Sequence, residues 1–140
     1  QDPRNLGAIA RVAEGVGAAG IVIPRRGSPG VTPTVAKASA GAVEHMAIAR
    51  VGSMVAFLHD ARGAGRTAIG AHPEGGTDYR ELAGPRGVPL VMGAEGEGPR
   101  PRVRDACDHL ARIPMEGRVA SLNISVAAAV LLYETLRITD

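Results

Sequence analysis

The most informative segment of the chain lies near its C-terminus: Ile113-Pro-Met-Glu-Gly-Arg-Val-Ala-Ser-Leu-Asn-Ile-Ser-Val-Ala-Ala-Ala-Val-Leu-Leu-Tyr-Glu134. It begins at the apolar end of a predicted strand and continues through a loop that contains Pro and Gly. The loop reaches Ser121-Leu122-Asn123 at the start of a strongly apolar helix. Packing of a hydrophobic core does not require this order of residues, so we expect the segment to serve a ligand as well as the core.

Upstream of this segment, short apolar runs rich in β-formers alternate with helix-like stretches. The predicted strands are 20–24, 47–51, 67–71, 88–92 and 109–113. The predicted helices are 7–18, 35–40, 52–64, 79–82, 102–107 and 122–136. Strands that are apolar on both faces and alternate with helices predict an α/β domain with a parallel sheet covered by helices.

Two long loops rich in Gly and Pro, Arg25–Pro33 and Gly93–Pro101, interrupt this alternation. Ligands of open α/β sheets bind beyond the carboxyl ends of the strands. The loops after the strands that end near Pro24, Met92 and Ile113 are therefore the predicted location of a site.

Composition limits the classes of function. A chain of 140 residues predicts one domain with a real core, and an aromatic content of 2% argues against a protein that stacks single-stranded bases on aromatic side chains. The net charge is only +2, but Lys37 is the only lysine, and the arginines include the pair Arg25 and Arg26 and the group Arg100, Arg102 and Arg104. Arginine forks suit phosphate, although a solvated surface also explains them.

Cysteine and histidine usage points away from disulfides and metals. The single cysteine, Cys107, fits a reducing cytoplasm and the interior of a core. The four histidines are dispersed and show no zinc-ligand spacing with Cys107. The apolar run 124–132 is too short to span a bilayer, and no signal peptide is visible, so we predict neither a metal nor a membrane.

The motif Gly15-Val-Gly-Ala-Ala-Gly20 matches the dinucleotide fingerprint, but its position is wrong. That fingerprint follows a strand and opens a helix, whereas this one closes a helical pattern and precedes the strand 20–24. We interpret it as a glycine stop at a helix C-terminus. A nicotinamide-dependent oxidoreductase is disfavoured for the same reason, and Ser121 lacks the His and Asp partners of a hydrolase triad.

Three other segments allow both a structural and a functional interpretation. In Asp2–Arg11, Asp2 or Asn5 caps a helix, but Arg11 stands in an otherwise small and apolar helical face. In Val91–Gly98, a strand ends in a glycine-rich turn that lets a ligand approach the backbone. At the start of the last helix, Ser121 or Asn123 is either an N-cap or part of a site.

Taken together and in this order, the three segments resemble the signature motifs of the SpoU-type (TrmH-like) RNA 2′-O-ribose methyltransferases of the SPOUT superfamily. Asp2–Arg11 is similar to the first motif, Leu90–Gly98 to the second and Ile113–Glu134 to the third. The segment Lys37-Ala-Ser-Ala-Gly-Ala-Val-Glu-His45 is similar to the RlmB-like subgroup, which acts on large-subunit ribosomal RNA. The resemblance extends over essentially the whole chain.

The resemblance implies a parallel α/β sheet with a C-terminal trefoil knot, a homodimer, S-adenosylmethionine as cofactor and 2′-O-methylation of a ribose in RNA. The catalytic residues implied by the motifs are Arg11, Asn5, Glu95, Ser121 and Asn123. The implied cofactor-binding residues are Gly93, Ile113, Met115, Gly117 and Leu122. The cationic residues expected to contact RNA phosphates are Arg25, Arg26 and Arg100.

The chain also departs from the family. The family's first strand, which precedes Asp2, and the N-terminal RNA-binding domain of RlmB-like proteins are absent from residues 1–140, so we interpret the chain as the catalytic domain alone. Two alternatives stay open: a transfer-RNA enzyme of the same family, and a non-catalytic knotted RNA-binding module. The combination of Asn5, Arg11, Glu95, Ser121 and Asn123 argues against a module that has lost its chemistry.

Overall fold

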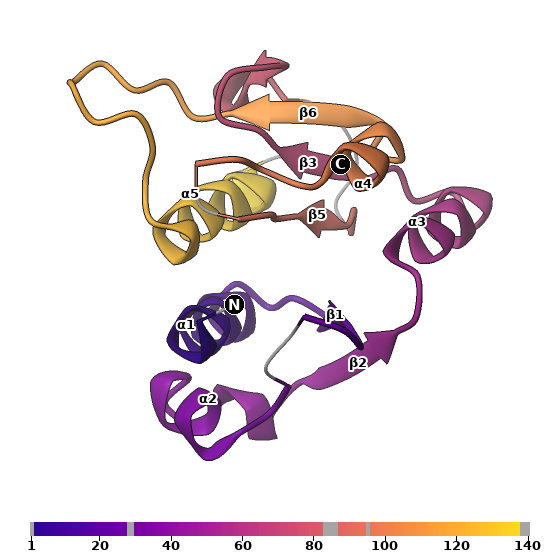
Figure 1. Cartoon of the computed structure of the whole chain (residues 1–140), viewed down its shortest axis with the longest axis vertical. Helices are drawn as coiled ribbons and strands as arrows, with labels where there is room; N and C mark the ends of the chain where they lie inside the picture. Colours follow the sequence, from indigo (N-terminus) through magenta and orange to yellow (C-terminus); the bar gives the residue numbers. More distant parts are fainter. Residues whose placement is uncertain (1, 28–29, 83–86, 95, 138–140) are drawn as a thin grey trace. The chain divides into compact units, whose positions relative to one another are not determined.

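The computed structural model describes residues 2–27, 30–82, 87–94 and 96–137. The chain divides into two compact units, unit 1 (Gln1–Met54) and unit 2 (Val55–Asp140), which are described separately. The helices are α1 (Pro3–Gly15), α2 (Pro33–Ala38), η1 (Ala42–Glu44), α3 (Met54–Gly63), η2 (Tyr79–Glu81), α4 (Pro101–Asp105) and α5 (Ile124–Arg137). The strands are β1 (Gly20–Pro24), β2 (Ala47–Val51), β3 (Ile69–Ala71), β4 (Thr77–Asp78), β5 (Leu90–Val91) and β6 (His109–Arg112) (Figure 1).

Unit 1 consists of two parallel strands and a pair of packed helices. β1 and β2 pair from Gly20 with Ala47 to Pro24 with Val51, so their carboxyl ends are level. Helix α1 packs against α2, and Gly7 makes the close approach possible. A Cβ at Gly7 would lie 2.5 Å from the Cβ of Ala38, so any larger residue there would push the helices apart.

Both ends of α1 are determined by local sequence. Asp2 is the N-cap, and its carboxylate accepts a hydrogen bond of 2.9 Å from the N–H of Arg4. At the other end Gly17 takes the left-handed conformation, with the N–H of Gly17 bonded to the carbonyl of Glu14 and that of Ala18 to Ala13. The interpretation of this glycine-rich segment as a helix stop is therefore confirmed, and Asp2 rather than Asn5 is the cap.

Unit 2 contains a parallel sheet of four strands in the order β4-β6-β3-β5. Ile69 on β3, Ala111 on β6 and Leu131 on α5 form a buried cluster, so α5 packs against the sheet (Figure 1). Half-buried apolar side chains from η2, β5 and the neighbouring loops surround this cluster. The expected α/β architecture with parallel strands and flanking helices is confirmed.

Cys107 and Gly70 show why small residues occupy the middle of this sheet. A Cβ at Gly70 would lie 2.9 Å from the Sγ of Cys107, so the sulfur takes the space that a side chain on β3 would need. Burial raises the pKa of the Cys107 thiol to about 11. The prediction that Cys107 serves as a small core residue agrees with this environment.

The predicted elements agree with the structure except at their ends. The predicted strands 20–24 and 47–51 are observed with the same bounds, whereas the predicted strands of unit 2 extend one to three residues beyond the observed ladders. β4 and η1 were not predicted, because a two-residue strand and a single 3-10 turn carry no hydrophobic period. Within the described residues, none of the helices combines the length and the apolar character needed to cross a membrane.

Candidate functional site

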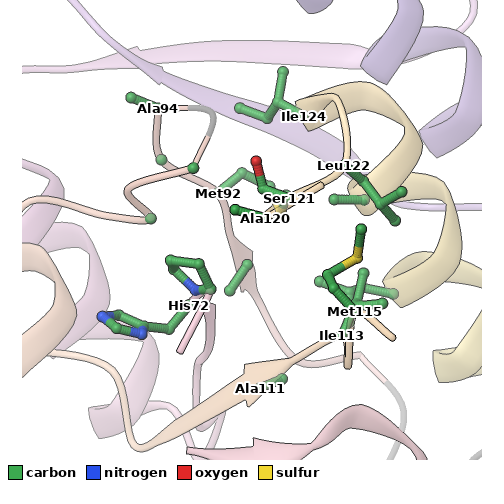
Figure 2. Close-up of a pocket in the computed structure, with 17 residues that line it drawn as sticks. His72, Met92, Ala94, Ala111, Ile113, Met115, Ala120, Ser121, Leu122 and Ile124 are labelled. Carbon is green, nitrogen blue, oxygen red and sulfur yellow. The ribbon is translucent and has the colours of Figure 1, made fainter. Parts of the chain in front are cut away.

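A pocket in unit 2 opens where β3, β5 and β6 end, at the same edge of the parallel sheet. The loops that follow these strands form most of its wall, and the first turns of α5 complete it (Figure 2). The empty space is about 530 Å³, part of it open to solvent. The lining residues are largely apolar and small: Ala71, His72, Pro73, Met92, Gly93, Ala94, Gly96, Gly98, Ala111, Ile113, Met115, Ala120, Ser121, Leu122, Ile124, Ala127 and Leu131.

Gly93 fixes the shape of the wall that follows β5. A Cβ at this position would overlap the backbone carbonyl of Gly98 and the nitrogen of Pro99. The chain turns back on itself here, because Ala94 and Gly98 form an antiparallel bridge and Gly98 has a φ of 77°. Glycine is therefore required at residue 93 by the close approach of two backbone segments, and the same turn presents the backbone of the loop to the pocket.

Ser121 lies in the pocket, opposite the glycine-rich loop. A Cβ at Gly96 would lie 3.4 Å from the Ser121 Oγ, so the hydroxyl faces the space beside this loop. Figure 2 shows the Ser121 hydroxyl and Ala94 on one side of the pocket, with Met115 and Leu122 on another. The hydroxyl thus gives a mainly apolar pocket a side-chain group that both donates and accepts hydrogen bonds.

Asn123, two residues later, caps α5. Its side-chain oxygen accepts hydrogen bonds from the backbone N–H of Ser125 at 2.9 Å and from the Ser125 hydroxyl at 2.5 Å. The capping interpretation therefore holds for Asn123, while Ser121 faces the pocket. Asn123 is exposed and is not among the lining residues.

His72 was not predicted as a site residue, although it lines the pocket just after β3. Its Nδ1 accepts hydrogen bonds from the backbone N–H groups of Gly75 at 2.8 Å and Glu74 at 3.2 Å. An accepting Nδ1 carries no hydrogen, so the ring has its proton on Nε2. The position directly after a predicted strand was a usable signal, but a lone histidine in a loop does not reveal this local bonding.

The structure brings several predicted cofactor-binding residues together. Gly93, Ile113, Met115 and Leu122 all line the pocket, although they come from three separate segments of the chain. Gly117 instead lines a neighbouring hollow, whose wall also includes Arg112 and Arg118. The parallel register explains the convergence, because β5 and β6 both pair with β3 and end at one edge.

The predicted catalytic residues are divided between the two units. Arg11 and Asn5 lie on α1 of unit 1, where Arg11 is exposed and Asn5 is half-buried. Ser121 and Asn123 belong to unit 2, as described above. Glu95 lies outside the described residues.

The predicted phosphate-binding arginines are exposed. Arg25 and Arg26 directly follow β1, and Arg100 is the N-cap residue of α4, two residues after the pocket-lining Gly98. Arg50 at the end of β2 was not predicted, yet its Nη2 donates a hydrogen bond of 3.1 Å to the carbonyl oxygen of Arg25. Among the described residues, no cluster of three or more His, Cys, Asp or Glu side chains has the arrangement of a metal site.

Comparison with known proteins gives concordant matches over nearly the whole chain. The sequence profile of the SpoU rRNA Methylase family matches residues 1–133. A Bacillus subtilis (strain 168) protein assigned to the TrmH family of tRNA/rRNA methyltransferases, YacO, is 46% identical over 98% of this chain and 55% of its own length. The chain thus spans about half the length of the curated relatives that it matches.

Two solved structures share the fold. The AdoMet-bound rRNA methyltransferase from Sinorhizobium meliloti is 34% identical with a TM-score of 0.87, over 97% of this chain and 52% of that one. A structure described as an RNA 2′-O ribose methyltransferase is 33% identical with a TM-score of 0.85, over 98% of this chain and 52% of that one. Both structures are therefore similar to this chain in sequence as well as in fold.

Proposed function

Because the chain belongs to the SpoU rRNA methylase family, we propose that it is the catalytic domain of an S-adenosylmethionine-dependent RNA methyltransferase. The proposed reaction is 2′-O-methylation of a ribose, with large-subunit ribosomal RNA as the substrate. The pocket formed by Gly93, Ile113, Met115, Ser121 and Leu122 is the observation that supports the proposal most strongly. The names of the relatives include transfer RNA as well, which makes a transfer-RNA substrate the alternative.

The pocket fits the proposed cofactor in the chemistry of its walls. Among its described lining residues there is no Lys, Arg, Asp or Glu, so the walls suit an adenine ring and the aliphatic part of a methionine chain. The tight turn at Gly93 and Gly98 exposes backbone groups that can bind the polar atoms of the nucleoside.

The bound cofactor would supply a methyl group on a sulfonium, which transfers to the ribose 2′-oxygen as the S–C bond breaks and the hydroxyl proton leaves. The residues of this chain are proposed to align the hydroxyl and to stabilise the charge that develops on its oxygen. Arg11 is assigned the main part. An arginine stays protonated at neutral pH and is a poor general base, but its charge lowers the pKa of a nearby hydroxyl. The proton then passes to an RNA phosphate or to water.

The other predicted catalytic residues are assigned supporting roles. Asn5 orients Arg11, with which it shares α1, and Ser121 hydrogen-bonds within the pocket. Asn123 holds the start of α5 through its bonds to Ser125, which keeps Ser121 and Leu122 in place. Glu95 is proposed to position the cofactor loop.

The proposed fold includes a trefoil knot in unit 2 and a homodimer. The convergence of the loops after β5 and β6 on one pocket, and the likeness to the two family structures, support the knot. Val126 and Tyr133, spaced seven residues apart on α5, are 48% and 51% exposed, and this apolar face supports the dimer.

Specificity for the target nucleotide is proposed to rest partly on an RNA-binding domain outside residues 1–140. The enzyme is proposed to work in the cytoplasm.

Two measurements test the proposed function. Calorimetric titration with S-adenosylmethionine should show one site per subunit, and NADH, the control ligand, should give no heat. Transfer of labelled methyl groups to ribosomal RNA, followed by nucleoside digestion, should give 2′-O-methylated ribose. Arg11→Ala should keep cofactor affinity and lose turnover by a factor on the order of 100 or more, as expected when a charge that acts in the transition state is removed. Near-normal turnover of Arg11→Ala would contradict the role of Arg11.

A further inference from the structure

Arg50 stands at the carboxyl end of β2, beside the segment that carries Arg25 and Arg26. In the parallel register Ile23 pairs with Arg50, one residue before the end of each strand. The segment that follows β1 therefore begins beside Arg50. The Nη2 of Arg50 donates to the carbonyl oxygen of Arg25 at 3.1 Å. A Cβ at Gly30 would lie 3.5 Å from the Nη1, so the same guanidinium occupies the space beside Gly30. The side chain of Arg50 therefore bonds the start of the segment that follows β1 and lies near Gly30 farther along it.

The positive charge at this strand edge has little acidic charge nearby in the sequence. Arg25, Arg26 and Arg50 are all exposed. Between Glu14 and Asp60 the only acidic residue is Glu44, which precedes the amino end of β2 at Ala47. At a rise of ~3.3 Å per residue, Arg50 lies ~10 Å along β2 from Ala47, which is the end of the strand nearer to Glu44. This separation exceeds the Debye length of ~8 Å at physiological ionic strength, so Glu44 does little to neutralise the arginines.

We propose that Arg25, Arg26 and Arg50, here called the arginine edge, bind the phosphate backbone of RNA, and that Arg50 is also the positioning residue that directs Arg25. The proposal rests on the proposed function, in which RNA is the substrate. Arg50 holds the backbone of Arg25 from the neighbouring strand, so both guanidinium groups are presented from one edge of unit 1. One N–H group of Arg50 donates to the carbonyl oxygen of Arg25, and the positive charge of the side chain remains at the same edge.

The shape of the arginine side chain makes this double role possible. A guanidinium has five N–H donors in a fixed plane, so it can bond a carbonyl with one nitrogen and a phosphate with another. A lysine ammonium is a compact point charge on a flexible stem. Lysine at residue 50 would keep the charge but would not hold both partners with the same geometry, which gives a conservative variant that separates the two roles.

The test measures binding of fluorescently labelled poly(U) RNA by anisotropy over a series of KCl concentrations. The variants are Arg25→Ala, Arg50→Met, Arg50→Lys and the double variant Arg25→Ala with Arg50→Met. Arg66→Met is the matched control, because Arg66 is likewise exposed and donates to a single backbone carbonyl, that of Gly87, at 2.7 Å. Circular dichroism and cofactor titration of each variant report on folding, and the cofactor pocket is lined by unit 2 residues alone.

One phosphate contact on single-stranded RNA contributes a salt slope of ~0.7, or about fivefold in affinity at ~0.1 M salt. We expect Arg50→Met to weaken binding by more than fivefold, since it removes one contact and displaces Arg25. When residue 25 is already Ala, the same change should cost only about fivefold. Arg50→Lys should keep most of the salt slope and still lose the coupling to Arg25, and Arg66→Met should leave affinity unchanged.

The outcomes separate failure of this inference from failure of the proposed function. If the wild-type protein binds poly(U) with a steep salt slope, but Arg50→Met and Arg50→Lys both match Arg66→Met, Arg50 has no part in binding and the inference is wrong. Equal effects of Arg50→Met in the presence and absence of the Arg25 side chain would overturn the positioning role. Absence of salt-dependent binding by the wild-type protein would overturn both the inference and the RNA substrate, while cofactor binding would then stand by itself.

Discussion

The pocket of unit 2 and the arginine edge of unit 1 both lie at the carboxyl ends of parallel strands, but they are built from opposite kinds of residue. The pocket is shaped by glycines and small apolar side chains, and its form depends on backbone segments in close contact. The arginine edge consists of long, exposed, charged side chains. A pocket of the first kind selects a ligand by shape, whereas an edge of the second kind holds a polyanion without regard to its sequence.

A side chain added to the pocket wall tests the role of backbone shape most directly. Gly93→Ala places a methyl group on the carbonyl of Gly98, so the loop must rearrange. We expect S-adenosylmethionine affinity to fall by a factor on the order of 100, which corresponds to ~2.8 kcal/mol and lies within the ~1–3 kcal/mol cost of an overpacked contact. Calorimetry measures the loss. Gly63→Ala, whose Cβ would meet nothing within 4 Å, is the control, and unchanged affinity of Gly93→Ala would mean that this loop does not bind the cofactor.

Removing positive charge from the arginine edge should weaken RNA binding and leave cofactor binding unchanged. The double variant Arg25→Ala with Arg26→Ala should lose two phosphate contacts, which corresponds to about 25-fold in RNA affinity at ~0.1 M salt and a decrease of ~1.4 in the salt slope. Anisotropy titration over a KCl series measures both quantities. Cofactor affinity should stay the same, because the pocket is lined by unit 2 residues. An unchanged salt slope would contradict the assignment of these arginines to RNA.

Asp108 tests how the strands that carry the pocket are held together. Its carboxylate accepts a hydrogen bond of 2.7 Å from the backbone N–H of Ala68 and pairs with Arg62 at 2.8 Å. Asp108→Ala should lower the free energy of unfolding by about 1 to 2 kcal/mol, because the buried Ala68 loses its hydrogen-bond partner. Urea denaturation measures the change. Asp105→Ala, which removes an exposed carboxylate 3.8 Å from Arg104, should change stability by less than about 0.5 kcal/mol.

Ala40 offers a smaller change in unit 1. It follows α2 with a φ of 54°, a left-handed conformation that costs an L-residue other than glycine roughly 1–2 kcal/mol. Ala40→Gly should raise the free energy of unfolding by about 0.5 kcal/mol, since relief of strain exceeds the added entropy of the unfolded chain. Thermal unfolding detects this shift. A destabilised Ala40→Gly protein would show that contacts of the Ala40 methyl outweigh its backbone strain.

The smallest expected effect concerns the pH dependence of stability in unit 2. Burial raises the pKa of Cys107 to about 11, above the ordinary thiol value of 9.0, so the folded state favours the protonated form. The resulting stabilisation is complete below pH 9 and is lost as the pH rises toward 11. Cys107→Ala should therefore show a flatter decline in stability between pH 9 and 11 than the wild-type protein. Equal declines, measured by urea denaturation at each pH, would exclude Cys107 as a contributor.

Much of the fold followed from the sequence because its signals are local. The apolar runs predicted β1 and β2 with their observed bounds, and the glycines at 15–20 predicted the end of α1. The strands of unit 2 were predicted too long, since apolar character extends beyond the paired residues at one end or at both. β4 was missed, because its two residues join the sheet only through pairing with β6.

For the candidate site, the sequence identified individual residues, and the structure showed which of them lie together. The motifs named residues in three segments, and the structure brings residues of the second and third segments together around one pocket: Gly93, Ile113, Met115, Ser121 and Leu122. His72 was not predicted, since its part in the pocket depends on hydrogen bonds within its own loop. For Asn123 the sequence allowed a cap or a site residue, and the bonds to Ser125 show that it caps α5.

Local sequence accounts for which stretches form helices and strands and for the types of residue at the edge of the sheet, because these features depend on neighbours within a few positions. Which of those residues meet follows from the packing of distant segments. The requirement for glycine at 93 comes from Gly98 and Pro99 folding back over it, and the contact of Arg50 with Arg25 comes from the register of two parallel strands. Such contacts depend on how distant segments pack, and hydrophobic periodicity along the chain carries no record of that packing.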